Sequence, residues 1–208
     1  MTRNADQNQR MRDERRERIL GDALRLFAAK GLSATRVADI ASAAEMSQGL
    51  LYHYFGSKED IFTELVRRAF ERMNAAAHGL EAVQMPPREK ILTAMTQLVR
   101  GIDEGEDFAR TVLLIAQAGV SEDTPEAARR IIEAESGVPY EVVEKIMRQG
   151  QEDGSVRQHD AAELAMLFWV TVKGLALHKA VNREAFKAPD VRILTSMFFV
   201  DENEEQGG

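Results

Sequence analysis

Apolar residues recur at three- and four-residue spacing along almost the whole chain, which is the pattern of amphipathic helices. Residues 15–31 (RRERILGDALRLFAAKG) show it clearly, with a stripe formed by Ile19, Leu20, Ala23, Leu24, Phe27 and Ala28. Gly31 is expected to end this helix, because glycine accepts the left-handed backbone of a C-terminal cap. No segment shows the sustained period-two alternation of a strand. The pattern therefore predicts an all-α protein.

Residues 33–60 hold two further helical patterns, each only about two turns long. We expect Thr35 to cap the first, whose inner face is Val37, Ile40 and Ala41. Ser47 should cap the second, Gln48 to Phe55. Two short helices joined by a tight turn predict a helix-turn-helix, whose second helix enters the DNA major groove.

The second short helix separates into a buried and an exposed side. Leu51 and Phe55 are four residues apart and should point inward together. The consecutive Tyr52, His53 and Tyr54 cannot all face the core of so short a helix, so some of them should be exposed to a partner. This argues against a purely structural helical protein.

A long helix is expected from Ser57 to about Leu80, with Ser57 as its N-cap and Asp60 at the third helical position. Lys58 then lies at a helix N-terminus, where its charge opposes the helix dipole. A phosphate beside the ammonium and the free N–H groups would remove that conflict. The alternative is a solvated lysine.

Helical patterns continue beyond Pro86 and Pro87, and the second proline suits the first turn of a new helix. Further helices are expected over 108–118, 125–137, 139–153, 160–182 and 189–199. The segment 160–182 is capped by Asp160 and is apolar on nearly all sides. A small domain rarely buries such a helix by itself, so we expect a second copy of the chain to cover it.

Four segments, LRLFAAKG, TRVADIA, SQGLLYHYF and SKEDIF, together resemble the TetR family of bacterial transcriptional regulators. In that family the helix holding SQGLLYHYF reads DNA. By position, the resemblance implies base contacts from Gln48, Gly49 and Tyr52, with His53 serving either role. It implies phosphate contacts from Thr35, Tyr54 and Lys58, and the predicted DNA-binding set is completed by Arg36 and Ser47. The family's usual turn glycine is replaced by Glu45, which must adopt the turn backbone or shift it.

The resemblance also implies the domain organisation. Residues 1–58 would form a three-helix DNA-binding domain and 59–200 a helical effector-binding and dimerisation domain, with a disordered arm (1–12) and acidic tail (201–208). Dimerisation would use 139–153 and 160–182. Apolar residues of the second domain are candidates for an effector pocket, although each alone fits an ordinary core: Met95, Phe108, Met147, Phe168 and Trp169.

Charge is distributed unevenly. The net charge is −7, yet residues 1–58 hold ten Lys/Arg and seven Asp/Glu, a balance of +3 that leaves −10 for the remainder. A basic end on an acidic body is expected when only one end meets phosphate. No cysteine is present and no secretory leader is visible. We expect no membrane span, which would need a run of about 20 apolar residues. The expected location is therefore the cytoplasm.

The residues that catalysis or metal binding would need are not arranged for it. The four histidines, His53, His78, His159 and His178, never recur at helical metal-ligand spacing. No phosphate-binding glycine loop or nucleophile elbow is present. An enzyme is the least favoured class, and no cofactor or metal is expected.

The favoured reading is a ligand-responsive homodimeric repressor, released from a near-palindromic operator by a small apolar or aromatic effector. An activator, or a regulator that responds to a protein partner, is the alternative.

Overall fold

The structure, a computed structural model, describes residues 2–200, with side chains described from residue 7 onward. The helices are α1 (Thr2–Ala34), α2 (Val37–Ala43), α3 (Gln48–Tyr52), α4 (Lys58–Ala82), α5 (Pro87–Glu104), α6 (Glu106–Ala118), α7 (Glu126–Glu135), α8 (Val138–Glu152), α9 (Ala161–Asn182) and α10 (Val191–Thr195). A short 3-10 turn, Arg183–Ala185, follows α9. The only strand-like pairing in the described part is one bridge between Val156 and Phe199. The all-α prediction is confirmed.

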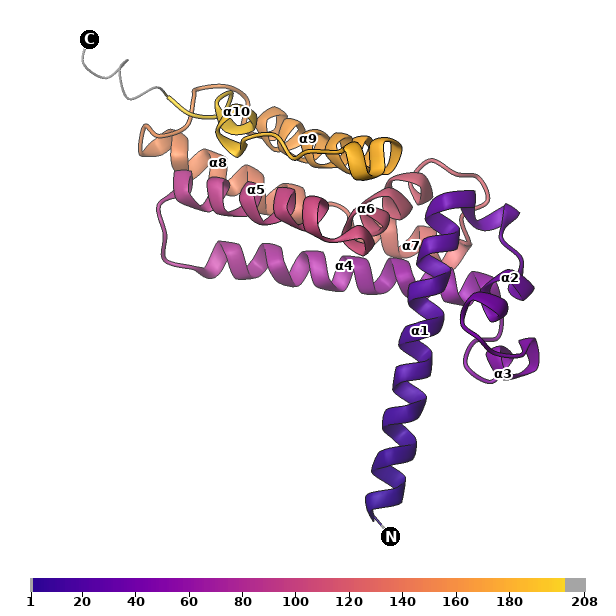
Figure 1. Ribbon diagram of the computed structural model, residues 1–208. Helices are drawn as coiled ribbons and strands as arrows, with labels where there is room; N and C mark the ends of the chain where they lie inside the picture. The colour runs from indigo at the N-terminus through magenta and orange to yellow at the C-terminus, as the bar shows by residue number, and fades with distance from the viewer. Residues whose placement is uncertain (1, 201–208) are drawn as a thin grey trace.

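Figure 1 shows the body as a stack of long helices, with α4 beneath α5 and α9 on the opposite side. The α2–α3 pair lies at one end of α4, and α1 crosses the same end. The first half of α1 projects away from the body. The expectation of a disordered arm over 1–12 is wrong for residues 2–12, which continue α1 as a helix. Residues 201–208 lie outside the described part.

Two apolar cores hold the molecule together. One joins α5, α8, α9 and the chain after α10, around residues such as Met95, Ile146 and Phe168. The other joins α1, α2, α3 and the first half of α4 with Leu114 and Ala118 of α6 and Ala128 of α7. Helices α1, α2 and α3 therefore share a continuous core with part of the body.

Most predicted helix ends are confirmed, but two helices are shorter than expected. The helix α3 ends at Tyr52 instead of Phe55, with His53 as its C-cap. The last helix covers only Val191–Thr195, and Asp190 caps its start by accepting from the Arg192 N–H at 2.8 Å. Gly31 breaks the regular backbone as expected, with a φ of 79°.

The chain leaves the helix after Thr195 and becomes part of the body core. Phe198 and Phe199 are buried there, although the apolar pattern had suggested that they continue the last helix. The Arg157 N–H donates to the Phe198 carbonyl at 2.9 Å, and the Arg88 guanidinium lies 4.4 Å from the centre of the Phe199 ring. Tertiary contacts thus overrode the helical period in this segment.

The segment Ala161–Ala185, which includes α9, is long and apolar enough to cross a membrane by length and hydropathy alone. The expectation that no run approaches a membrane span is therefore wrong. Only 33% of its most apolar stretch is buried in the single chain. One such helix is weak evidence for a membrane protein, and α9 packs through Leu164, Phe168 and Val172 into the body core. Its outer face is nevertheless apolar and uncovered.

Candidate nucleic-acid interface

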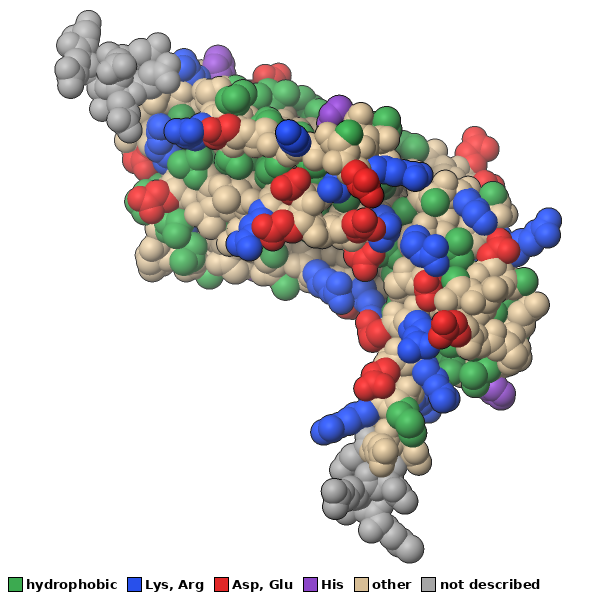
Figure 2. Space-filling view, in the orientation of Figure 1, with side chains coloured by type: hydrophobic (Ala, Val, Ile, Leu, Met, Phe, Trp, Pro, Cys, Tyr) green, Lys and Arg blue, Asp and Glu red, His purple; other side chains and the backbone are tan. Residues whose placement is uncertain are grey.

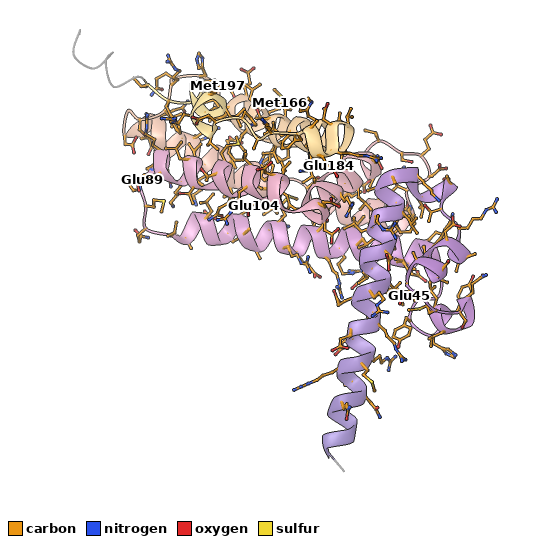
Figure 3. The ribbon with its side chains drawn as sticks, viewed as in Figure 1. Glu45, Glu89, Glu104, Met166, Glu184 and Met197 are labelled. Carbon is orange, nitrogen blue, oxygen red and sulfur yellow. The ribbon has the colours of Figure 1, made fainter. Side chains whose placement is uncertain are left out.

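The turn between α2 and α3 is built on a left-handed residue. Glu45 has a φ of 56°, so glutamate adopts the turn backbone that the family usually gives to glycine. The Ala44 N–H donates to Ile40 and the Met46 N–H to Ala41, both at 2.9 Å, which closes the end of α2. The Glu45 carboxylate lies 3.4 Å from the Arg18 guanidinium of α1. Figure 3 shows Glu45 on the side of the turn that faces α1. The backbone bonds thus close the end of α2, and the exposed Glu45–Arg18 pair joins the turn to α1.

The start of α2 differs from the prediction. Arg36, not Thr35, is the N-cap residue, and its N–H donates to the Asp39 carboxylate at 3.3 Å. The Thr35 side chain is fully buried and its hydroxyl donates to the Gly31 carbonyl at 2.8 Å. The cap expected of Thr35 is therefore wrong, whereas its phosphate contact stays a prediction, and in the free chain its hydroxyl is directed inward. Arg36 is exposed beside it.

The helix α3 is anchored from one side and open on the other. Ser47 caps it as predicted, since its hydroxyl accepts from the Leu50 N–H at 3.2 Å. Leu51 and Phe55 are buried, which confirms their inward orientation. Tyr52 is 51% exposed, and three further residues of the predicted DNA-binding set, Gln48, Gly49 and His53, are exposed as well. Tyr54, by contrast, is half-buried and packs against the core.

Gly49 is not required by the protein's own packing. A Cβ built there would meet only the Ser47 hydroxyl, at 4.0 Å. Glycine costs roughly 1 kcal/mol relative to alanine inside a helix. Open space around an unfavourable glycine on the exposed edge of α3 suits close approach of another molecule to the backbone.

Lys58 makes a contact that sequence reasoning missed. Its ammonium donates to three backbone carbonyls at the end of α1 and the start of the next turn: Leu32 at 2.9 Å, Ser33 at 3.3 Å and Thr35 at 2.9 Å. An ammonium has three protons, so these bonds use all of them. The charge that opposes the α4 dipole is thus stabilised by the C-terminal carbonyls of α1 without a phosphate.

Replacing Lys58 by alanine is expected to lower the free energy of unfolding by about 1–3 kcal/mol, because charged hydrogen bonds to three carbonyls, two of them part-buried, are lost. Urea denaturation with an unchanged slope would measure this. Lys30→Ala, which removes only an exposed pair 3.7 Å from Asp39, should cost under about 0.5 kcal/mol. An unchanged stability of Lys58→Ala, together with a salt dependence of DNA binding lowered by one phosphate contact, would restore the phosphate role.

A groove of about 360 Å³ opens between the starts of α2 and α4, and it is lined by Ser33, Thr35, Arg36, Val37, Tyr52, Gly56, Ser57, Lys58 and Glu59. The first N–H groups of α4 have no acceptor within the helix. The Asp60 N–H is satisfied by the N-cap, because it donates to the Ser57 hydroxyl at 3.0 Å. Backbone N–H groups and an exposed Arg36 beside Tyr52 are suited to an anionic phosphate. This groove borders the exposed edge of α3.

An ion-pair network ties α1 to α4 directly behind the helix-turn-helix. The Glu64 carboxylate accepts from Arg16 at 2.8 Å and from Arg68 at 3.0 Å, and Arg68 also donates to Glu17 at 2.7 Å. The Arg16 guanidinium lies 5.1 Å from the centre of the Phe55 ring. Partial burial acts to raise the pKa of Glu64, but the bonds from Arg16 and Arg68 outweigh it and hold this pKa below its ordinary value. The sequence offers only the Glu64–Arg68 spacing as a signal, since Arg16 is 48 residues away.

Glu64→Gln should destabilise the protein by about 1–2 kcal/mol at pH 7, where the carboxylate is ionised and paired. A carboxyl whose pKa is lowered on folding adds stability that is complete above its unfolded value and is lost as pH falls through its folded value. The difference in melting temperature between wild type and Glu64→Gln should therefore shrink below about pH 4.5. Glu133→Gln, on α7, is the control. A difference that stays constant down to pH 3 would contradict the ion-pair account.

Charged side chains gather on the surface around α1. In the face drawn in Figure 2, Lys and Arg side chains lie along the projecting part of α1 and where α1 meets the body, interleaved with acidic residues. Hydrophobic side chains lie along the opposite edge, which carries α9 and α10. Among the described residues, no group of three or more His, Cys, Asp or Glu could hold a metal ion.

The residues expected to line an effector pocket lie in or beside the body core. Met95, Met147 and Phe168 are buried in that core, and Trp169 packs against it. The Trp169 N–H donates to the Pro139 carbonyl at 3.2 Å. Phe108 is exposed at the start of α6, with its ring close to Gly101. The structure thus brings four of the five together, with Phe108 apart from them.

Comparison with known proteins agrees with this geometry. Residues 19–65 match the profile of the bacterial regulatory proteins of the tetR family. The HTH-type transcriptional repressor KstR2 of Rhodococcus jostii (strain RHA1) is 29% identical over 164 residues, which cover 76% of this chain and 78% of that protein.

Solved structures share the fold. The MbdR regulator from Azoarcus sp. CIB superimposes with a TM-score of 0.76 at 24% identity, covering 86% of this chain and 94% of that one. AibR in complex with isovaleryl coenzyme A and operator DNA gives 0.70 at 18% identity, covering 88% and 98%. The matched segment 19–65 contains the capped α3 helix, the left-handed turn and the start of α4 described above. Residues 19–65 therefore form a DNA-binding domain of the tetR family of bacterial regulatory proteins, and the chain is a DNA-binding transcriptional regulator, not an enzyme.

Proposed function

We propose that this regulator is a homodimeric repressor that inserts α3 into the major groove of a near-palindromic operator and is released by a small molecule. The observation that carries the proposal is the exposed edge of α3, where Gln48, Gly49, Tyr52 and His53 face outward while Leu51 and Phe55 hold the helix in the core. A rigid anchor with a polar and aromatic outer edge is what base reading needs.

The DNA contacts divide into two groups in this proposal. Gln48 and Tyr52, with the open backbone at Gly49, meet base edges, and His53 meets either a base or the backbone. Arg36, Ser47 and the first turn of α4 meet phosphates beside the groove. Tyr54 reaches a phosphate only through its outer edge, because its ring packs on the core. Lys58 acts indirectly, by holding the end of α1 against the start of α4.

The dimer forms through α8 and α9 in this proposal. The uncovered face of α9 carries Met166, Leu167, Val170, Leu177 and Val181, all exposed in the single chain. Figure 3 places Met166 on the outer edge of the body. A contiguous apolar face of this kind is typical of a protein–protein interface. A second copy accounts for it without a membrane.

The effector would bind in the body, in a pocket that includes Met95, Met147, Phe168 and Trp169. Phe108, exposed at the start of α6, is the fifth proposed contact. Because the first four residues are packed in the free chain, the pocket would open by repacking, and methionine suits such repacking. A mainly apolar or aromatic molecule would then favour a body conformation with lower DNA affinity.

In this proposal the chain has two domains. Residues 1–58 read DNA and 59–200 bind effector and partner, although the two parts share the core described above. A regulator of DNA works inside the cell, and we place this one in the cytoplasm.

The test is a single titration of the purified protein bound to a labelled operator. A panel of small apolar and aromatic molecules is added, and operator anisotropy and Trp169 fluorescence are followed together. The expected result is a compound that shifts the fluorescence and lowers operator affinity over the same concentration range. A compound that binds tightly yet leaves operator affinity unchanged would contradict release, because equal affinity for both states shifts nothing.

A further inference from the structure

The N-terminal half of α1 extends beyond the folded body. Every described side chain from residue 7 to residue 15 is exposed, and the first buried residue is Ile19. In Figure 1 this part of α1 continues past α2 and α3, away from the other helices. From Thr2 to Arg15 it is about 21 Å long, at about 1.5 Å per residue. A helix of this length that no described element covers has no role in the core of the single chain.

Helical spacing separates the charges of the projecting part into two faces. Arg12 and Arg15 precede the buried Ile19 by seven and four residues, so all three lie on one face. The opposite face holds Arg10 and the acidic residues between positions 7 and 18, which are Asp13, Glu14 and Glu17. Figure 2 shows both signs of charge along this part of α1, and the spacing places them on different sides. The face with Arg12 and Arg15 is therefore basic and free of acidic residues.

This basic face is turned toward the helix-turn-helix. Arg16 shares the face, and its guanidinium lies 5.1 Å from the centre of the Phe55 ring, just after α3. Arg12 lies about one turn before Arg16 and so just beyond this contact. The Arg18–Glu45 pair, at 3.4 Å, joins the neighbouring turn of α1 to the turn between α2 and α3. The major groove is about 12 Å wide, so a helix that extends about 21 Å beside α3 reaches the backbone at the edge of the groove that α3 enters.

The two arginines that project beyond the body are unpaired. Arg16 binds Glu64 at 2.8 Å, whereas the guanidinium groups of Arg12 and Arg15 make no hydrogen bond or ion pair within the described chain. A free guanidinium keeps five N–H donors in a planar fork that fits a phosphate. Solvation alone would suit one such arginine. Two of them on an acid-free face beside α3 indicate a common anionic partner.

We propose that the projecting half of α1 is a second DNA contact, in which Arg12 and Arg15 bind phosphates of the duplex that α3 reads. These contacts position the protein and carry no sequence information. The acidic face with Arg10 points away from the duplex. The inference rests on the proposed function for the presence of DNA, and it adds an arm that lies outside the family-matched residues 19–65.

The salt dependence of binding to a random-sequence duplex tests the arm in the full-length protein. Each phosphate contact adds about 0.9 to the slope of log affinity against log salt concentration. Arg12→Ala and Arg15→Ala should each flatten the slope by about 0.9 for each bound protomer. For the double variant, the loss of affinity between about 50 and 200 mM salt should be about tenfold smaller than for the wild-type protein. Because both side chains are exposed, the melting temperature should stay at the wild-type value.

Arg10→Ala is the matched control, because it removes the same side chain from the acidic face, two residues before Arg12. It should leave the slope unchanged. Wild-type slopes for Arg12→Ala and Arg15→Ala would overturn the contact, and equal flattening by Arg10→Ala would overturn the assignment to one face. Both of those outcomes leave DNA reading by α3 intact. A wild-type protein that binds no duplex would instead overturn the proposed function and the arm together.

Discussion

Replacing Val170 and Leu177 together by glutamate is expected to convert the proposed dimer into monomers and to abolish specific operator binding. These residues are 54% and 57% exposed on the uncovered face of α9. In the dimer they would be buried, and an unpaired buried charge costs several kcal/mol. Operator affinity should fall by at least about 100-fold, because two linked DNA modules gain about 10²–10⁴ in avidity over one. Sedimentation and anisotropy measure the two effects.

Val120→Glu is the matched control, since this residue is 86% exposed just beyond the end of α6. It should leave both mass and affinity unchanged. Leu175 is a less clean choice for the same test, because it packs partly against the body core and its loss would also disturb folding. A double variant that stays dimeric would show that α9 is not the interface.

Gln48→Ala is expected to reduce discrimination between operator and random DNA by about 1–3 kcal/mol, or about 5- to 150-fold. The Gln48 side chain is exposed at the first position of α3, and a glutamine amide can pair bidentately with adenine. Binding to random duplexes should change little, because Gln48 carries no charge. Parallel anisotropy titrations on the two duplexes give the ratio.

Gln117→Ala, an exposed glutamine on α6, should leave that ratio unchanged. If Gln48→Ala kept the wild-type sequence preference, base reading would have to be reassigned to Tyr52 or His53.

The parts of the fold that local sequence determines were predictable. Ser47 and Asp160 cap their helices as expected, since a cap depends on residues two or three positions away. Ser57 does the same for α4. The inward pair Leu51 and Phe55 followed from helical spacing. Glu45 could be placed in the turn, and the structure shows that it adopts the left-handed backbone.

The parts that depend on long-range contacts were not predictable. The carbonyls that Lys58 binds lie 23–26 residues earlier in the chain, so no local pattern signals them, and the sequence alone suggested a phosphate as the partner of its ammonium. Threonine is a residue type that often caps helices, but the Thr35 side chain is buried and its hydroxyl donates to the Gly31 carbonyl. The short α10 reflects Phe199 pairing with Val156. The Asn74 amide of α4 donates to the Glu135 carboxylate of α7, 61 residues later, and no local pattern signals this contact.

Selection of bound duplexes from a random pool tests the central claim most directly. The account predicts enrichment of an inverted repeat whose half-sites are centred about one helical turn, 10–10.5 bp, or a multiple of it, apart. It also predicts that the Gln48→Ala variant loses preference at specific positions of that repeat. Enrichment of no sequence, or of a single half-site without symmetry, would contradict a dimer that reads DNA through α3.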